Sequence, residues 1–193
     1  MLSCDVLELF RRSGALLDGH FALSSGLHSG GYLQCALVLQ HPVYAEELGM
    51  ALAGLARAFE PTVVMSPALG GLVVGHEVAS ALGVRAVFAE RQDGRLRLRR
   101  GFQITSGERV LVVEDVVTTG GSTCETIAVA QGAGGHVVGA VAIINRSGAS
   151  PDVGVPFQAL ADAAVPTHQP ETCPLCARNV PLTKPGSRVR SGR

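Results

Sequence analysis

The sequence has no tryptophan, and aromatic residues make up only 4% of its 193 residues. It has no excess of charge either, since 16 basic residues balance 16 acidic ones, so no nucleic-acid partner is indicated. No apolar run approaches the roughly 20 residues of a membrane-spanning helix, which excludes a membrane-embedded class of protein. Charged residues interrupt the first apolar stretch, where an export signal would lie: Asp5, Glu8, Arg11 and Arg12. We therefore expect a cytoplasmic protein.

Two common nucleotide-binding motifs are also missing. The sequence contains no Gly-x-x-x-x-Gly-Lys-Ser/Thr, which would cradle a nucleoside triphosphate. No Gly-x-Gly-x-x-Gly follows the apolar run at 110–113, where a dinucleotide-binding fold would carry it. Neither class of nucleotide-binding protein is supported.

Apolar runs alternate with helical patterns along the chain, which is typical of an α/β fold with a mostly parallel central sheet flanked by helices. The patterns predict strands at 62–65, 84–88, 110–113 and 137–144, and helices at 3–13, 42–60, 75–82 and 123–132. Ser3 is a plausible N-cap of the first helix, and Pro42 suits the first turn of the second. The length suits one compact domain, and the basic residues after Thr183 predict a disordered tail.

The segment 110–123, VLVVEDVVTTGGST, is the most informative part of the sequence. Its first half is typical of a buried parallel strand, and its second half of a turn that opens a helix. Such a turn directs backbone N–H groups, hydroxyls and the positive end of a helix dipole at one place, which suits a phosphate. Glu114 and Asp115 would repel a bare anion but can hold the hydroxyls of a sugar. The segment thus indicates a sugar-phosphate site.

An ordinary strand followed by a capped helix is the alternative, since Ser122 or Thr123 is a good N-cap. A cap accounts for one hydroxyl, whereas the segment has an acid pair, four hydroxyls and two glycines.

Two further loops follow predicted strands and should lie at the same edge of the sheet. The loop 66–71, SPALGG, lets the backbone approach a ligand closely, although a tight turn explains it equally well. The loop 90–101 has five arginines: Arg91, Arg95, Arg97, Arg99 and Arg100. The alternation over 95–99, RLRLR, places arginines on one face of an extended segment and leucines on the other. A solvated hairpin explains the alternation. Beside a pyrophosphate site, however, the guanidinium groups could neutralise the departing group, and Gly94 would let the loop act as a lid.

The five cysteines are an odd number in a chain without an expected export signal, so a disulfide framework is not indicated. Cys173 and Cys176 have the spacing of half a zinc site, but tetrahedral zinc needs four ligands. Cys4 from a symmetric dimer or His168 could contribute. The alternative is a reduced, packed turn without metal.

The segment 110–123 resembles the phosphoribosyl-pyrophosphate (PRPP) signature of type I phosphoribosyltransferases. The resemblance implies that fold, with a small N-terminal hood, and a catalytic role for Glu114, Asp115 and Arg91. It also implies that PRPP is bound by Arg91, Gly70, Gly71 and the whole signature: Glu114, Asp115, Val116, Val117, Thr118, Thr119, Gly120, Gly121, Ser122 and Thr123.

The segment 21–32, FALSSGLHSGGY, resembles the corresponding N-terminal segment of the orotate phosphoribosyltransferases, which are members of this family. The resemblance implies that Thr118, Arg146 and Ser24 contact orotate. Many relatives have a lysine at the position of Ser24. Arg146 follows the predicted strand 137–144, and a guanidinium can hold the carboxylate of orotate through two parallel hydrogen bonds. Uracil and the purines lack that carboxylate.

The resemblance implies transfer of phosphoribose from PRPP to orotate, giving orotidine 5′-monophosphate and pyrophosphate in pyrimidine biosynthesis. Mg2+ would be held by the substrate and not directly by the protein. The family pattern further implies one domain at 1–182, with 1–41 contributing the hood and 183–193 forming the tail, in a homodimer that shares its lid loops. Two alternatives remain: a transferase of the same fold that acts on a purine or uracil, and a nucleotide-binding regulator that binds RNA.

Overall fold

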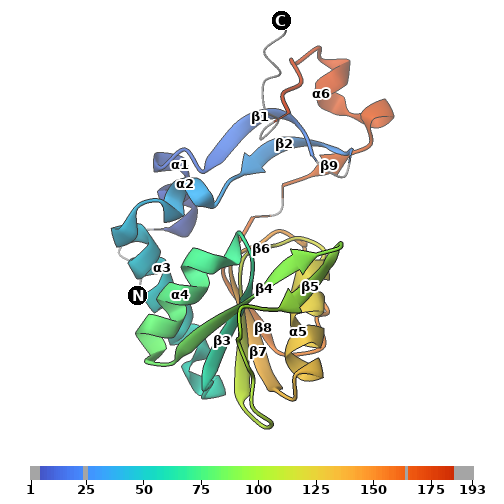
Figure 1. Ribbon diagram of the computed structural model, residues 1–193. Helices are drawn as coiled ribbons and strands as arrows, with labels where there is room; N and C mark the ends of the chain where they lie inside the picture. The colour runs from blue at the N-terminus through green and yellow to red at the C-terminus, as the bar shows by residue number, and fades with distance from the viewer. Residues whose placement is uncertain (1–4, 24–25, 164, 185–193) are drawn as a thin grey trace, which may run out of the picture.

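The computed structural model describes residues 5–23, 26–163 and 165–184. It consists of a large sheet flanked by helices and a small antiparallel sheet that stands above one end of the large one (Figure 1). Ser24 and Cys4 lie outside the described residues, as do 185–193 of the expected tail. No helix within the described ranges is long and apolar enough to cross a membrane.

The large sheet has six strands in the order β5-β4-β3-β6-β7-β8. All neighbours are parallel except β4 and β5, which form an antiparallel hairpin. The expected α/β fold with a mostly parallel sheet is confirmed. The strands are β3 (Val63–Pro67), β4 (Arg85–Gln92), β5 (Arg95–Leu98), β6 (Arg109–Val117), β7 (His136–Asn145) and β8 (Phe157–Asp162).

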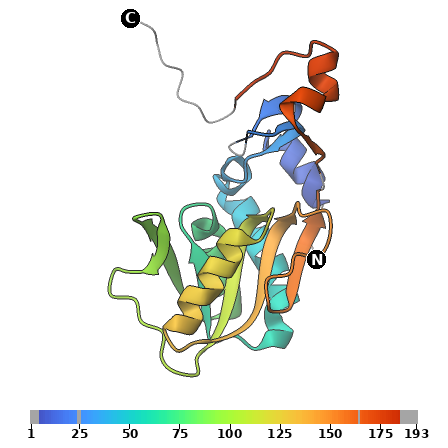
Figure 2. The same cartoon turned by 90° about the vertical axis from the view of Figure 1, so that its right-hand side faces the viewer.

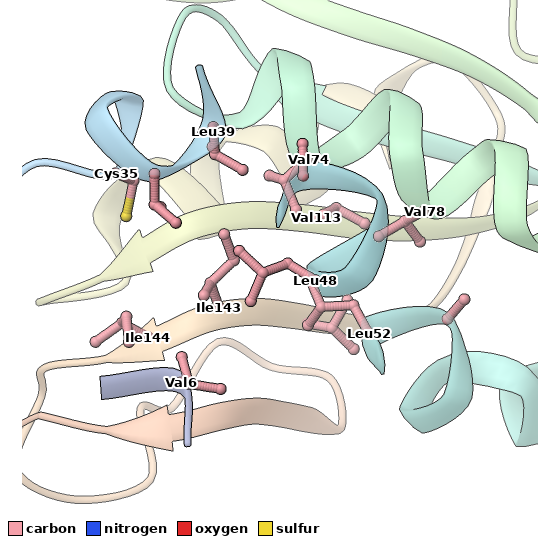
Figure 3. Close-up of a cluster of buried hydrophobic side chains, with 14 of the residues drawn as sticks. Val6, Cys35, Leu39, Leu48, Leu52, Val74, Val78, Val113, Ile143 and Ile144 are labelled. Atoms are coloured by element: carbon pink, nitrogen blue, oxygen red, sulfur yellow. The ribbon is translucent and has the colours of Figure 1, made fainter. Parts of the chain in front are cut away.

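Helices cover both faces of this sheet (Figure 2). On one face lie α3 (Pro42–Ala56), continued by the 3-10 turn η1 (Arg57–Phe59), and α4 (Gly71–Leu82); on the other lies α5 (Gly121–Gly132). Because the central strands are covered on both faces, their side chains are apolar in succession and do not alternate with polar ones. Val112 packs toward α5, whereas Val113 packs among α3 and α4 (Figure 3).

The small sheet joins distant parts of the chain in the order β1-β2-β9. Its strands are β1 (Leu16–Ala22), β2 (His28–Leu33) and β9 (Thr167–His168), and two short helical turns follow, η2 (Pro170–Thr172) and α6 (Pro174–Ala177). The chain then returns to β1, where Thr183 pairs with Phe21 and its N–H donates to the carbonyl of His20. Thr183 was expected in the tail, but it is part of this structure.

The N-terminal helix α1 (Val6–Arg12) and the short helix α2 (Ala36–Leu39) extend the core on the α3 face. Ser3 lies outside the described residues, and Asp5 caps α1 by accepting a hydrogen bond from the N–H of Leu7. In Figure 3, Val6 of α1 and Leu39 of α2 lie in the same cluster as Leu48 and Leu52 of α3. This packing fixes the small sheet to the large one, because α1 precedes β1 and α2 follows β2.

Candidate active site

The signature segment lies at the carboxyl edge of the large sheet, below the small sheet. Strand β6 is longer than the predicted 110–113, because its parallel pairing with β7 continues to Val117. Glu114 and Asp115 are therefore strand residues. They do not belong to the turn, and strand geometry sends successive side chains to opposite faces. Thr118 and Thr119 follow as exposed residues of the turn itself.

Gly120 is the residue that makes the turn into α5. It has a φ of 78°, in the left-handed region that favours glycine, and it occupies the N-cap position without a side-chain cap. The alternative of a helix capped by Ser122 or Thr123 is not what the structure shows, since both lie within the first turn of the helix. The hydroxyl of Ser122 instead hydrogen-bonds to Glu114. The N–H of Gly121 makes one long hydrogen bond, of 3.4 Å, to Oγ1 of Thr119, and the N–H groups that open α5 suit an anion.

The loop 66–71 lies against the acid pair. A β-carbon at Gly70 would lie 2.7 Å from Oδ2 of Asp115, and one at Gly71 would lie 3.1 Å from the carbonyl oxygen of Val113. The absence of side chains at both positions lets the start of α4 approach the end of β6. The structure therefore brings Gly70, Gly71 and Asp115 together, as the sequence predicted.

The pKa values of both acids are raised, which favours their protonated forms. Burial raises the pKa of Glu114 to about 8, the neighbouring charge of Asp115 adds to the rise, and the hydrogen bond from Ser122 opposes it. Burial also raises the pKa of Asp115, against the hydrogen bond from the N–H of Val116, which is 2.9 Å from Oδ1. At neutral pH, Glu114 is thus largely protonated and can donate a hydrogen bond.

A cavity of about 490 Å3 opens between the signature turn and the small sheet. Thr118, Thr119 and Arg146 line its floor, and Leu27 and Tyr32 lie on the side of the β1–β2 hairpin. The remaining lining residues are Leu23, Ser147, Val165 and Thr167. Val165 and Thr167 were missed by the sequence analysis, because nothing in their local pattern relates them to the signature turn or to Arg146.

The guanidinium of Arg146 has no hydrogen-bond or ion-pair partner among the residues that the structure describes, although its backbone N–H donates to the carbonyl of Val117. Burial lowers the pKa of Arg146, and no neighbouring carboxylate offsets this. A partly buried cation that faces a cavity without an acidic partner is suited to an anionic ligand. The carboxyl edge thus brings Arg146 and Thr118 to one cavity.

A second cavity, of about 330 Å3, lies on the α2 side of the acid pair. Asp115, Gly70, Leu69 and Val73 line it together with residues around α2: Gln34, Ala36, Leu39 and Gln40.

The arginine-rich segment forms the β4–β5 hairpin. Arg95 and Arg97 are exposed while Leu96 is buried, which confirms the alternation, and Asp93 and Gly94 make the turn with positive φ values. Arg91 donates to Glu125 of α5 at 3.0 Å and to the carbonyl oxygen of Gly94.

Glu125 connects this hairpin to the helix that opens at the signature turn. Its other carboxylate oxygen accepts from the N–H of Leu96 at 2.6 Å. At the base of the hairpin, Arg100 pairs with Glu90 at 2.8 Å. The sequence analysis did not single out Glu125, because a lone acid on a helix carries no signal of its partner.

Comparison with known proteins identifies the family. Residues 37–154 match the model of the phosphoribosyl transferase domain. The chain is 54% identical over 186 residues to the orotate phosphoribosyltransferase of Heliobacterium modesticaldum, covering 95% of this chain and 97% of the relative. It is 51% identical over 184 residues to that of Pelotomaculum thermopropionicum, covering 95% and 97%.

Solved structures agree with this assignment. The orotate phosphoribosyltransferase of Mycobacterium tuberculosis in complex with inorganic phosphate is 26% identical, with a TM-score of 0.67, over 81% of this chain and 93% of that one. The same enzyme in complex with PRPP is 25% identical, with a TM-score of 0.65, over 82% of this chain and 96% of that one. With the signature turn at the carboxyl edge of the sheet and these relatives along nearly its whole length, the chain belongs to the orotate phosphoribosyltransferases of the phosphoribosyltransferase family.

Proposed function

We propose that the chain transfers the phosphoribosyl group of PRPP to orotate, giving orotidine 5′-monophosphate and pyrophosphate for pyrimidine biosynthesis. The bond between the ribose and pyrophosphate breaks, its electron pair leaves with pyrophosphate, and a ring nitrogen of orotate, whose proton passes to water, bonds to the same carbon. The single observation that carries the choice of base is Arg146, whose guanidinium has no acidic partner among the described residues and lines the cavity beside Thr118.

Orotate would occupy the 490 Å3 cavity with its carboxylate on Arg146. The ring would lie beneath Leu27 of the β1–β2 connection and Tyr32 of β2, whose apolar surface excludes water from the reacting atoms. Neither uracil nor a purine could use the charge of Arg146. The lining therefore favours orotate over the alternative bases.

The signature turn would bind the 5′-phosphate of PRPP. Backbone N–H groups at the start of α5, the hydroxyls of Thr118 and Thr119 and the helix dipole all favour an anion at this place. Gly120 and Gly121 keep the backbone accessible, and Ser122 remains tied to Glu114. The turn therefore needs no lysine, and the only lysine of the sequence is Lys184.

The two acids would act on the ribose. Protonated Glu114 can donate to a ribose hydroxyl, and the carboxylate form of Asp115 can accept from one. As the bond to pyrophosphate loosens, positive charge develops on the sugar, and the carboxylate of Asp115 stabilises it. Positioning and charge stabilisation suffice for this reaction, so no covalent nucleophile is needed.

Mg2+ fits this site, because the groups that line the 330 Å3 cavity include the oxygen donors of Asp115 and no sulfur or imidazole ligand. When bound, Mg2+ would neutralise charge on the pyrophosphate. The oxygens of PRPP would hold it, and Asp115 would orient the hydroxyls that take part.

Arg91 would stabilise the departing pyrophosphate after leaving Glu125. The ion pair is half exposed on the arginine side, so its contribution to stability is small and its exchange for a pyrophosphate contact is feasible. Since the hairpin turn is exposed, Arg91 could act in its own site or in that of a second subunit. We propose the second, in a homodimer; a cytoplasmic location stays a prediction.

Loss of orotate absorbance on addition of PRPP and Mg2+ tests the reaction, with uracil and hypoxanthine as alternative bases. We expect turnover with orotate alone; turnover only with another base would contradict the proposal. Asp115→Asn should lower kcat by about 100-fold or more with an almost unchanged melting temperature. Asp18→Asn, a change of an exposed acid on β1, is the matched control and should keep normal turnover.

Mixing two inactive variants tests the shared lid. If Arg91 acts in the partner's site, Arg91→Ala and Asp115→Asn chains that exchange at random regain about a quarter of the wild-type activity, because half of the dimers have one intact site. No recovery after verified exchange would place Arg91 in its own site.

A further inference from the structure

Four potential metal ligands converge between the small sheet and the C-terminal segment. The ring nitrogens of His20 and His28 and the sulfurs of Cys173 and Cys176 all lie within 4.8 Å of one another. His20 lies on β1, His28 on β2, Cys173 at the N-cap of α6 and Cys176 within α6. The expected completion by Cys4 or His168 is not what the structure shows. Cys4 lies outside the described residues, and His168 pairs with His28 in the sheet without joining the cluster.

The distances within the cluster match a tetrahedral zinc site. Zinc–nitrogen bonds of about 2.0 Å and zinc–sulfur bonds of about 2.3 Å require about 3.3 Å between two nitrogens and about 3.6 Å between nitrogen and sulfur. Nε2 of His20 lies 3.1 Å from Nδ1 of His28. The sulfur of Cys173 lies 3.5 Å from Nε2 of His20, and that of Cys176 lies 3.3 Å from Nδ1 of His28 and 3.8 Å from Nε2 of His20.

A backbone carbonyl orients the first of these ligands. Nδ1 of His20 lies 2.8 Å from the carbonyl oxygen of Val180, a contact that requires the proton on Nδ1 and leaves a lone pair on Nε2. That lone pair faces three groups, Nδ1 of His28 and the two sulfurs, and can accept a hydrogen bond from only one at a time. A metal ion at their centre would satisfy all of them. The carbonyl of Val180 then has the role of an outer-shell partner that fixes the tautomer of a ligating histidine.

Burial and charge agree with a metal. His20, His28 and Cys173 are buried, while Cys176 is exposed and gives an ion a path into the site. Two thiolates and two neutral imidazoles would neutralise a divalent cation, so no net charge would be buried. Two cysteines and two histidines in a tetrahedral arrangement are typical of structural zinc sites without an open position.

We propose that His20, His28, Cys173 and Cys176 bind one structural zinc ion. The ion joins residues 153 positions apart in the sequence and fixes α6 against the β1–β2 hairpin. His28 follows Leu27 directly, and Leu27 lines the orotate cavity. Zinc would thus stabilise the β1–β2 hairpin where it covers that cavity, without taking part in the reaction.

Elemental analysis of the full chain, purified without a histidine tag and dialysed, tests the proposal. We expect about one zinc per chain. Cys173→Ser/Cys176→Ser and His28→Asn should reduce this to a small fraction. His168→Asn, next to the cluster, and Cys124→Ser, an exposed thiol on α5, are matched controls for metal content and should keep it.

Cobalt gives a readout that does not depend on folding of a variant. Co2+ added to the reduced, metal-free wild-type chain should give the thiolate charge-transfer band and the visible bands of a tetrahedral site, and added zinc should remove them. Removal of zinc by a chelator should lower the melting temperature, and its return should restore it. Absence of both zinc and the cobalt bands in reduced protein would overturn the proposal. So would a Cys173–Cys176 disulfide, seen as a loss of two thiols, or zinc that persists in the double variant.

Discussion

Gly70 and Asp115 lie so close that a β-carbon on the glycine would come within 2.7 Å of one carboxylate oxygen and 2.9 Å of the other. The start of α4 can therefore approach the end of β6 this closely only because residue 70 has no side chain. This contact joins the loop 66–71 to the end of β6, and it makes the position of the carboxylate sensitive to the smallest substitution.

Gly70→Ala should displace Asp115 and lower kcat/KM for PRPP by about 10- to 100-fold, since a displacement of about 1 Å has effects of that size. The backbone of Gly70 has φ −56° and ψ −44°, which alanine adopts without strain, so the melting temperature should change little. Steady-state kinetics at varied PRPP measures the effect. Gly54→Ala, in α3 with open space around the glycine, is the control and should keep its activity. Equal kinetics of both variants would show that the fit at Gly70 is unimportant.

Arg146→Gln should lower kcat/KM for orotate by about 10- to 100-fold, the range expected for a charged hydrogen-bonded contact, while KM for PRPP changes little. Arg146→Lys should recover only part of the loss, because an ammonium cannot form the two parallel hydrogen bonds of a guanidinium. Arg57→Ala, far from the cavity at the end of α3, serves as a control. A parallel loss for orotate and PRPP would count against a contact with the base.

Glu114 should make the unliganded protein less stable as the pH rises. Below its ordinary pKa of 4.5, both the folded and the unfolded chain hold the proton; between that value and about 8, only the folded chain does. The contribution of the raised pKa to the free energy of unfolding is therefore complete below pH 4.5 and is lost as the pH rises to about 8. Urea denaturation at several pH values measures it.

Glu114→Gln should weaken this pH dependence, because the amide carries no charge in either state. Glu46→Gln, at an exposed position of α3, should behave like the wild type. Parallel curves for Glu114→Gln and the wild type would mean that Glu114 is ionised in the folded protein at neutral pH.

Alanine substitution of each hairpin arginine in turn should identify the one that acts on pyrophosphate: Arg91, Arg95, Arg97, Arg99 and Arg100. We expect the largest fall in kcat for Arg91→Ala, about 10- to 100-fold, because its surface ion pair with Glu125 can be exchanged for a contact with pyrophosphate. All five side chains are largely exposed or paired at the surface, so the melting temperatures should remain close. A larger fall for another arginine would assign the role to that residue.

The sequence predicted the buried strands well, because their runs of valine, leucine and isoleucine have few alternatives in an α/β protein. Bounds were less accurate where polar or small residues continue an element. Glu114 and Asp115 extend β6, since ladder pairing with β7 holds them there. Helix α4 begins at Gly71, before the predicted 75–82, because packing and not propensity fixes its glycines: a β-carbon at Gly75 would meet the hydroxyl of Ser66 at 2.6 Å.

Local motifs of the site could be predicted, whereas partners from distant segments could not. The signature turn and Arg146 are each recognisable within a few residues of sequence. The pairing of His20 and His28 with Cys173 and Cys176 depends on a bulge in β1 between Asp18 and Phe21 and on the return of the chain after β9. Neither feature leaves a pattern in the sequence, so two scattered histidines carried no sign of their role.

The small sheet takes strands from both ends of the chain, and this determines when it can form during synthesis. The β1–β2 hairpin leaves the ribosome early, but β9 and Thr183, which complete its edges, are made last. The six-stranded sheet has all of its strands by residue 162 and can assemble first. The part of the small sheet that covers the base cavity is consequently the final part of the enzyme to fold. In a nascent chain stalled before residue 167, the large sheet with the signature turn can be complete while the small sheet still lacks β9.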